Sequence, residues 1–495
     1  MQRPNIVFLF PDQLRYDFLS TYGAKFISTP NIDSIADNGV KYQNAYSASP
    51  LCVPARTSLL LGINAIKHGV TDNFHFLRPN YKSAGFSTWP ELLADDGYKT
   101  TAIGKMHFYP WDSLLGFHER VIAEDKRWPY IKDDYAEFLE ASGYRKYRGD
   151  EHDGYHENKG AIISLVPWSH SVDRFVGQSA CAFIEKQKPE KPFVMMVGFP
   201  GPHCPYDPAE DFSVKYDPDD MPDSIPAAPM NTPSIRKANI QGNKQPWNGV
   251  DYSDFPEWSK KKIRAHYAGL VKQIDFEVGE ILESLRKKGV LDNTLVIFAS
   301  DHGDWLGDHD LIGKGAFYEG AIRIPMIISG PGFESGETTS ELVELRDITA
   351  TILNAANVQI PSYFDSNSLQ STKEGNKRER IFGMLRHGWM NFDGRWKLHK
   401  YNTGDYALFD MENDPTEQIN LIHDTTNSTV LARLESELAA EVMISMNLSM
   451  HDRLQSIGSD GSGLSNEPLF GNRGWSRPEL VSITEMGPGV QGRST

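Results

Sequence analysis

The chain has 495 residues, a formal net charge of −16 and a hydrophobic content of 39%, with 23% charged residues. These values are typical of a globular protein with a large core, and they exclude a disordered chain, a collagen-like chain and a coiled coil. The acidic balance argues against a nucleic-acid or membrane partner, although one local group of cations would suffice for a small anionic substrate.

Five short apolar runs, rich in β-branched and aromatic residues, are predicted to be strands: Asn5 to Phe10, Lys99 to Ile103, Phe193 to Gly198, Thr294 to Ser300 and Met326 to Ser329. They lack polar alternation, so we expect them to be buried on both faces. The clearest helical pattern extends from Lys261 to Lys288, with Gly289 as its C-cap. Strands that alternate with helices predict an α/β domain over residues 1–375, with a large, mostly parallel sheet sandwiched by helices.

The composition changes near residue 375, where the polar stretch STKEGNKRER indicates a domain boundary. Beyond it, Asp393-Gly394 separates two apolar-aromatic runs and predicts a β-hairpin, and a helical pattern follows from about Asn427 to Met446. We therefore expect a small C-terminal subdomain over 376–455, an antiparallel sheet plus a helix. Residues 456–495 are interpreted as a flexible segment and a C-terminal arm that lies on its own subunit or on a neighbour in a homo-oligomer, or as a frayed tail.

The three cysteines, Cys52, Cys181 and Cys204, form no disulfide framework and fit a reducing compartment. No apolar run approaches the roughly 18 residues that a membrane helix needs. The apolar run near the N-terminus is shorter than the roughly 7–15 residues of a signal-peptide core. We therefore expect a soluble cytoplasmic protein, or a periplasmic one if a leader has been removed.

Polar clusters follow the predicted strands or lie in loops rich in glycine and proline, where an α/β fold places its site. They are Asp12-Gln13, Cys52-Val53-Pro54-Ala55-Arg56, Lys105 with His107, His203, and Asp301-His302 with Lys314. Each alone is ambiguous, because a strand-end Asp often caps a turn and a buried Cys is often structural. Together they offer oxygen and imidazole donors for one divalent cation, with cations and imidazoles beside it for a tetrahedral anion.

The chain resembles the type I, formylglycine-dependent sulfatases of the alkaline phosphatase superfamily. The resemblance rests on NIVFLFPDQLR, CVPAR, GKMH, PHCPY, SDHGD and LFDMENDPTEQINL, in that order. It implies that Cys52 is oxidised to formylglycine by a formylglycine-generating or anaerobic sulfatase-maturating enzyme, and that Arg56 orients the modified residue. It also implies a metal, most often Ca²⁺ with Mn²⁺ or Mg²⁺ as alternatives, held by Asp12, Gln13, Asp301 and His302.

The same resemblance implies that the sulfate and the leaving group are contacted by Lys105, His107, His203 and Lys314. Asn73 in GVTDN matches a sulfate contact seen in part of the family. The implied reaction hydrolyses a small anionic sulfate monoester to an alcohol and sulfate. A hydrated formylglycine has two geminal hydroxyls, so one can attack sulfur and the other can let sulfate leave, which a serine does not allow.

Asp12-Gln13 departs from the Asp-Asp pair of many members of the family. An Asp-Gln pair also occurs in choline sulfatases and in phosphonate monoester and phosphodiester hydrolases, so these activities stay as alternatives, with a non-catalytic binding protein as a third. The HCPY and ENDPTEQ segments resemble carbohydrate sulfatases and favour a sulfated sugar. Trp305 is interpreted as a stacking residue or as one packed beneath the site. Arg386 and His387 are interpreted as substrate contacts from the second domain or as a solvated surface pair.

Overall fold

The computed structural model describes residues 3–188, 190–213, 215–228, 233–370 and 377–450. The boundary predicted near residue 375 and the arm predicted over 456–495 lie outside these residues. Within the described part of the chain, no helix combines the length and the apolar composition that crossing a bilayer requires.

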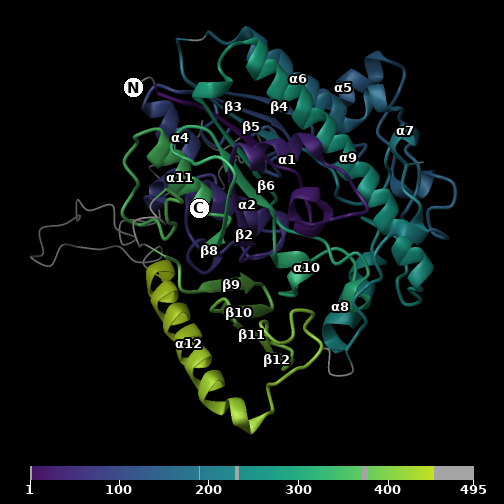
Figure 1. Ribbon diagram of the computed structural model, residues 1–495, viewed down its shortest axis with the longest axis vertical. Helices are drawn as coiled ribbons and strands as arrows, with labels where there is room; N and C mark the ends of the chain where they lie inside the picture. The colour runs from purple at the N-terminus through teal and green to yellow at the C-terminus, as the bar shows by residue number, and fades with distance from the viewer. Residues whose placement is uncertain (1–2, 189, 214, 229–232, 371–376, 451–495) are drawn as a thin grey trace, which may run out of the picture.

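An eight-stranded sheet with the order β4-β3-β5-β1-β6-β7-β2-β8 forms the centre of the molecule (Figure 1). Its strands are β1 (Asn5–Leu9), β2 (Gly39–Tyr46), β3 (Lys99–Gly104), β4 (Glu119–Ile122), β5 (Phe193–Gly198), β6 (Thr294–Ala299), β7 (Met326–Ser329) and β8 (Glu337–Glu344). All pairs are parallel except those of β7, which is antiparallel to both β6 and β2. The five predicted strands and the mostly parallel sheet are therefore confirmed.

Helices cover both faces of this sheet. One face is covered by α1 (Pro30–Asp37), α5 (Asp134–Ala141), α6 (Val172–Lys186) and α9 (Glu257–Lys287), and the other by α2 (Cys52–Leu61), α4 (Trp89–Asp95) and α11 (Asp347–Ala355). In β1, Val7 packs into the first layer and Phe8 into the second, which explains why the strand has no polar face. The predicted helix Lys261–Lys288 coincides with most of α9, and Gly289 follows it with a φ of 70°.

A second, four-stranded antiparallel sheet has the order β12-β11-β10-β9. It consists of β9 (Ile381–Leu385), β10 (Gly388–Phe392), β11 (Trp396–Tyr401) and β12 (Tyr406–Asp410). The predicted hairpin joins β10 to β11, with Gly394 at a φ of 92°. Helix α12 (Ser428–Met450) covers one face of this sheet through Leu434.

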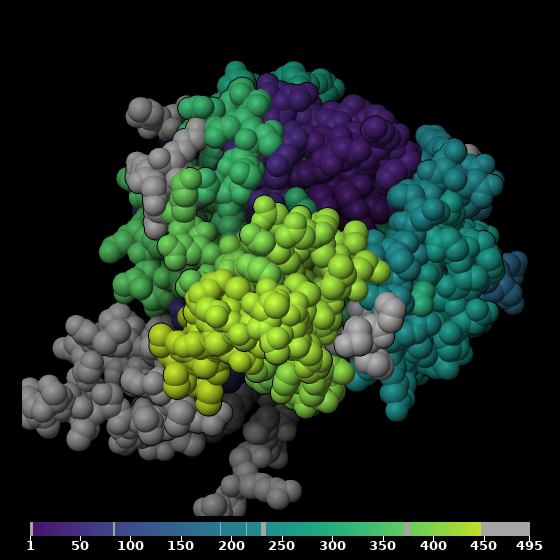
Figure 2. All heavy atoms as spheres, turned by 60° about the horizontal axis from the view of Figure 1, so that its bottom comes forward, coloured from purple at the N-terminus to yellow at the C-terminus, as the bar shows by residue number. Residues whose placement is uncertain are grey.

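The other face of the small sheet packs against the large domain through an aromatic core. This core contains Tyr46, Phe317 and Tyr318 from the large domain, and Phe392 and Phe409 from the small sheet. Viewed from below, the small sheet and α12 form a yellow-green mass seated against the larger domain (Figure 2). The small sheet therefore closes one side of the region beyond the strand ends.

Candidate active site

The predicted site residues gather at the carboxyl ends of four neighbouring strands. In the sheet, β3, β5, β1 and β6 are adjacent. Asp12 and Gln13 follow β1, Lys105 and His107 follow β3, His203 follows β5, and Asp301 and His302 follow β6. Because parallel strands end at the same edge, this order alone brings side chains nearly 300 residues apart into one site, as the hydrogen bond from Gln13 to Asp301 shows.

A pair of glycines allows β3 and β5 to stay close where they end. The Lys105 amide donates to the Gly198 carbonyl at 2.8 Å. A Cβ atom on Gly104 would lie 2.1 Å from that same carbonyl oxygen, and one on Gly198 would lie 2.1 Å from the Lys105 carbonyl oxygen. The glycine before Lys105 is therefore required to hold this lysine at the strand end.

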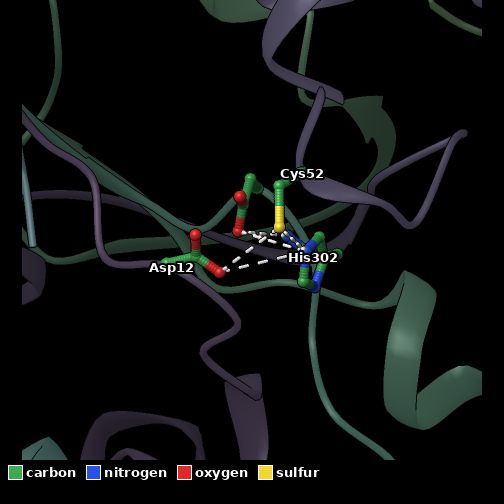
Figure 3. A group of neighbouring side chains, drawn as sticks. Asp12, Cys52 and His302 are labelled. Atoms are coloured by element: carbon green, nitrogen blue, oxygen red, sulfur yellow. Dashed lines mark hydrogen bonds and ion pairs between the residues drawn. The ribbon is translucent and has the colours of Figure 1, made fainter. Parts of the chain in front are cut away.

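Cys52 is the first residue of α2. Its Sγ lies 3.2 Å from His302 Nε2 and 3.7 Å from Asp12 Oδ1 (Figure 3). Burial raises the pKa of the Cys52 thiol, but Lys314, His302 and Lys105 outweigh burial and lower that pKa well below its ordinary value. The position therefore favours a negative charge.

Asn73 supports the start of α2. Its side-chain oxygen accepts a hydrogen bond from the Val53 amide at 3.0 Å. The residue predicted as a sulfate contact thus lies directly beside Cys52 and satisfies one of the free amides of the helix N-terminus.

A buried group of four side chains could hold a metal. Ligand atoms of Asp12, Cys52, Asp301 and His302 lie within 4.8 Å of one another. His302 Nδ1 donates to the Gly303 carbonyl at 2.9 Å, which leaves Nε2 directed into the group. Carboxylate oxygens and an imidazole nitrogen suit a divalent cation, so the donor set fits the implied metal.

Gln13 lies beside this group in a left-handed backbone conformation, with a φ of 71°. Its backbone amide donates to Asp301 Oδ1 at 3.0 Å. Its side-chain Nε2 donates to Asp304, and its Oε1 accepts from Lys314. Asp304 also accepts from Tyr206 Oη at 2.7 Å, so it fixes Gln13 Nε2 and leaves Gln13 Oε1 facing the Lys314 ammonium.

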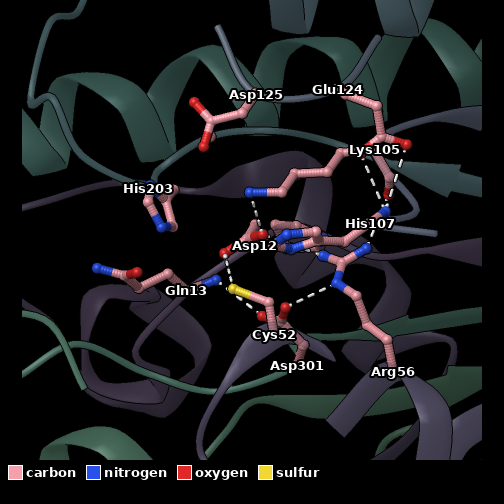
Figure 4. Close-up of polar contacts among 12 residues, drawn as sticks. Asp12, Gln13, Cys52, Arg56, Lys105, His107, Glu124, Asp125, His203 and Asp301 are labelled. Carbon is pink, nitrogen blue, oxygen red and sulfur yellow. Dashed lines mark hydrogen bonds and ion pairs between the residues drawn. The ribbon is translucent and has the colours of Figure 1, made fainter. Parts of the chain in front are cut away.

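Two cations compensate the buried carboxylates (Figure 4). Lys105 Nζ lies 2.8 Å from Asp12 Oδ2. Arg56 Nε lies 2.9 Å from Asp301 Oδ2, and Arg56 NH1 donates to the Lys105 carbonyl at 2.7 Å. The planar guanidinium thus fixes the ends of α2, β3 and β6 relative to one another.

His203 and Lys314 form a second pair. His203 Nδ1 donates to the Cys204 carbonyl at 2.8 Å, and His203 Nε2 lies 2.7 Å from Lys314 Nζ. Burial, Lys314 and Lys105 lower the pKa of His203 to about 3. The imidazole is therefore neutral, and its Nε2 accepts a hydrogen bond from the Lys314 ammonium.

Sequence reasoning missed the acidic pair Glu124-Asp125, which follows the unpredicted strand β4. Glu124 accepts from the backbone amide of His107 at 3.0 Å, where His107 has a φ of 59°. Burial raises the pKa of Asp125, but Arg127, Lys105 and His203 lower it well below its usual range. Both acids are labelled beside the centre in Figure 4. Two acidic residues directly after a short apolar run were the signal available in the sequence.

The three residues expected to contact substrate lie in different surroundings. Trp305 is 1% exposed and belongs to the aromatic core between the two sheets, so it packs beneath the site and offers no face for stacking. Arg386 and His387 are exposed and line a cavity of about 190 Å³. Leu51 and Gly315, the chain neighbours of Cys52 and Lys314, line the same cavity.

Comparisons with known proteins agree with this geometry. A family model described as Sulfatase matches residues 4–358, and one described as N-sulphoglucosamine sulphohydrolase, C-terminal, matches residues 307–443. An arylsulfatase of Clostridium perfringens is 31% identical, covering 85% of this chain and 90% of that protein. A choline-sulfatase of Rhizobium meliloti is 29% identical, covering 85% and 82%.

A solved structure has the same fold. The phosphonate monoester hydrolase of Agrobacterium radiobacter superposes with a TM-score of 0.76 at 23% identity, covering 89% of this chain and 96% of that one.

Proposed function

Because the chain belongs to the sulfatase family of the alkaline phosphatase superfamily, we propose that this sulfuric ester hydrolase acts through Cys52 after its conversion to formylglycine. The observation that carries the proposal is the position of Cys52. It stands at the N-terminus of α2, 3.2 Å from His302, in one buried group with Asp12 and Asp301. No other described cysteine lies in such a group.

The cations around Cys52 explain how an anionic ester could approach. Lys105 and Lys314 both act on the charge of Cys52, and Arg56 lies across the carboxylates behind it. A sulfate monoester repels a plain anionic nucleophile, so positive side chains must neutralise it and orient sulfur for in-line attack. Their burial strengthens this effect, because charge interactions are weakly screened where water is excluded.

The aldehyde of formylglycine would supply, when hydrated, one hydroxyl for attack on sulfur and a second from which sulfate is released. His107 is the residue placed to take up a proton there, since its side chain hydrogen-bonds Cys52 and its Nδ1 has no partner among the described residues. Glu124 holds the backbone of His107. The base is thus positioned by a hydrogen bond as well as by packing.

Lys314 and His203 form the proton donor for the departing alcohol. His203 is neutral and accepts from Lys314, as Gln13 Oε1 does, so the ammonium is held in place while its third proton can reach an oxygen. An alkoxide leaving from sulfur needs a proton, which makes this pair the general acid of the proposed reaction.

Asp12, Gln13, Asp301 and His302 would hold the divalent metal, with Ca²⁺ as the expected ion. A bound cation would supply charge stabilisation and would lower the pKa of a hydroxyl beside it. His302 presents Nε2, Asp304 holds the Gln13 side chain through its Nε2, and Arg56 fixes Asp301. These contacts position the donors before any ion binds.

We assign a sulfated carbohydrate as the substrate. The match of residues 307–443 to the C-terminal region of N-sulphoglucosamine sulphohydrolase supports this assignment. The similarity to a phosphonate monoester hydrolase keeps that activity as the second candidate. The similarity to a choline-sulfatase keeps choline sulfate as an alternative substrate.

The decisive experiment compares kcat/KM for an aryl sulfate and an aryl phosphonate, using protein co-expressed with a maturating enzyme and a Cys52→Ala variant as background. We expect hydrolysis of the sulfate at a kcat/KM at least about tenfold above that for the phosphonate, a difference of roughly 1.4 kcal/mol. A preference for the phosphonate would replace the proposal with the second candidate. Equal turnover by the Cys52→Ala variant would remove Cys52 from the mechanism.

A further inference from the structure

A cavity lies between the large domain and the small sheet, directly beside the centre. We call it the interface cavity and define it by Leu51, Asp72, Phe74, Gly315, Arg386 and His387. Leu51 precedes Cys52, and Gly315 follows Lys314 in the chain. Lys314 is the proposed proton donor to the leaving oxygen, so the cavity next to it along the chain is the candidate site for the alcohol half of the ester.

One loop connects the cavity to the nucleophile. Asn73 binds the Val53 amide at the start of α2, and its neighbour Asp72 forms an ion pair with Arg386 NH1 at 3.3 Å. The Arg386 amide donates to the Thr71 carbonyl at 3.0 Å. Residues 71–73 therefore fix the position of Arg386, in the small sheet, relative to Cys52, in the large domain.

The cavity offers no excess negative charge to a cationic occupant. Asp72 is already used, because it accepts from the amides of Phe74 and His75 at 2.8 and 3.0 Å, from His75 Nδ1 at 2.8 Å and from Arg386. A quaternary ammonium would therefore meet the guanidinium of Arg386 without a free carboxylate to balance it. The pairing of one anion with one cation leaves the cavity nearly neutral.

The donors and walls of the cavity suit a hydroxylated ring. The Arg386 side chain is 55% exposed, and Asp72 is its one ion-pair partner among the described residues. Its remaining N–H groups can therefore donate to hydroxyl oxygens. Leu51, Phe74 and Tyr401 supply apolar and aromatic surface for the C–H face of a ring.

The volume limits the size of the occupant. The interface cavity encloses about 190 Å³, less than the roughly 300–1,000 Å³ of pockets that bind drug-sized ligands. The space beside the centre is therefore sized for one ring.

We propose that the interface cavity binds the alcohol half of the substrate as a single uncharged, hydroxyl-bearing ring, and that Arg386 is a specificity-determining residue. This inference rests on the proposed function, because it assigns the leaving group of the same reaction. It also predicts that the enzyme removes sulfate from monosaccharides.

The test measures kcat and KM on four probes: glucose monosulfate, galactose monosulfate, choline sulfate and 4-nitrophenyl sulfate. For Arg386→Ala, kcat/KM on the best sugar sulfate should fall about 10- to 100-fold, mainly through KM, as expected for loss of a charged hydrogen-bond donor. With the aryl sulfate it should change less than about threefold, because that ring offers no hydroxyl to the guanidinium. Arg386→Lys should keep more of the sugar activity than Arg386→Ala, because lysine keeps the positive charge but lacks the paired N–H donors of the guanidinium.

Arg395→Ala is the matched control. Arg395 is another half-exposed arginine of the small sheet, paired with Asp410 at 2.8 Å and absent from the cavity. Its kinetics should equal those of the wild type on all four probes. Equal losses on sugar and aryl sulfate in Arg386→Ala, or a wild-type preference for choline sulfate, would overturn the inference while leaving sulfatase activity intact. Absence of turnover on every sulfate ester would instead contradict the proposed function.

Discussion

The centre around Cys52 and the interface cavity beside it are built in opposite ways. In the centre, Asp12, Asp301 and His302 are each 0% exposed and sit at the ends of neighbouring strands. In the cavity, Phe74 is 82% exposed and the Arg386 side chain 55% exposed, and they come from a loop and from the small sheet. The centre therefore fixes the reaction through rigid backbone, whereas the cavity can select the alcohol without altering the chemistry.

The largest effect is expected from Cys52→Ser. A serine hydroxyl could attack sulfur but lacks the second hydroxyl that releases sulfate, so turnover should fall at least about 1,000-fold on every ester. Steady-state release of alcohol and of sulfate measures this directly. Cys181→Ser, at a half-buried cysteine of α6, is the control and should keep full activity. Sustained turnover by Cys52→Ser would show that the centre does not work as described.

Lys105→Met should lower kcat/KM about 100- to 1,000-fold, because it removes a buried cation that we propose faces the sulfate. The loss should be equal for sugar and aryl esters, in contrast to that of Arg386→Ala. Lys146→Met is the matched control, since Lys146 forms a similarly buried pair with Asp133 at 2.7 Å outside the centre. A loss confined to one class of alcohol would mean that the centre and the cavity are not separate in function.

Asp304→Asn tests whether the centre is positioned before the metal binds. The new side-chain amide would present an N–H group to Gln13 Nε2, which is itself a donor. The Gln13 side chain would therefore rotate and displace its Oε1. We expect Ca²⁺ affinity, measured by calorimetric titration, to fall about 10- to 100-fold. Asp310→Asn, in the same loop but paired with Lys260 and Arg236, should bind Ca²⁺ like the wild type. Unchanged affinity in Asp304→Asn would exclude Gln13 as an oriented ligand.

The smallest expected effect is on the free energy of unfolding, and it arises at the contact between the two sheets. Lys397 is fully buried between Glu319 at 2.6 Å and Glu417 at 2.8 Å. Burial, against the opposing effect of Lys397, raises the pKa of Glu417 from 4.5 to about 7. The folded state thus holds this proton more tightly than the unfolded chain, and the resulting stability is present below pH 4.5 and lost as the pH rises to about 7.

Glu417→Gln should therefore remove a slope of up to ~1.4 kcal/mol per pH unit in the free energy of unfolding over this range. Urea denaturation at several pH values measures the slope, and Glu412→Gln, at an exposed residue nearby, is the control. Identical slopes in both variants would contradict a raised pKa at Glu417. Because the group lies outside the centre, kcat/KM on the aryl sulfate should not change in either variant.

The same contrast explains what the sequence could predict. Asp12, Lys105, His203 and Asp301 follow buried strands, so their approximate meeting place follows from the rule that ligands bind at strand ends. The direction of β7 could not be predicted, because a strand buried on both faces shows the same apolar run in either orientation. The left-handed backbone at Gln13 and His107 is imposed by tertiary contacts and leaves no local signal.

The cavity was less predictable than the centre. Arg386 meets Asp72 only because aromatic residues pack the small sheet in one orientation, and their pairing across 314 residues leaves no periodic pattern. The same packing buries Trp305, whose position in the motif SDHGDW had suggested a place in the pocket. Motifs therefore located the chemistry, whereas the packing of the two sheets decides which side chains meet the alcohol.

The central claim is that residue 52 acts as an aldehyde and not as a thiol. Mass spectrometry of the peptide containing residue 52, on preparations made with and without a maturating enzyme, gives the fraction converted in each. We predict that sulfate-ester turnover rises in proportion to that fraction and is at background in wholly unmodified protein. Full turnover by a preparation in which every chain carries the Cys52 thiol would contradict the account.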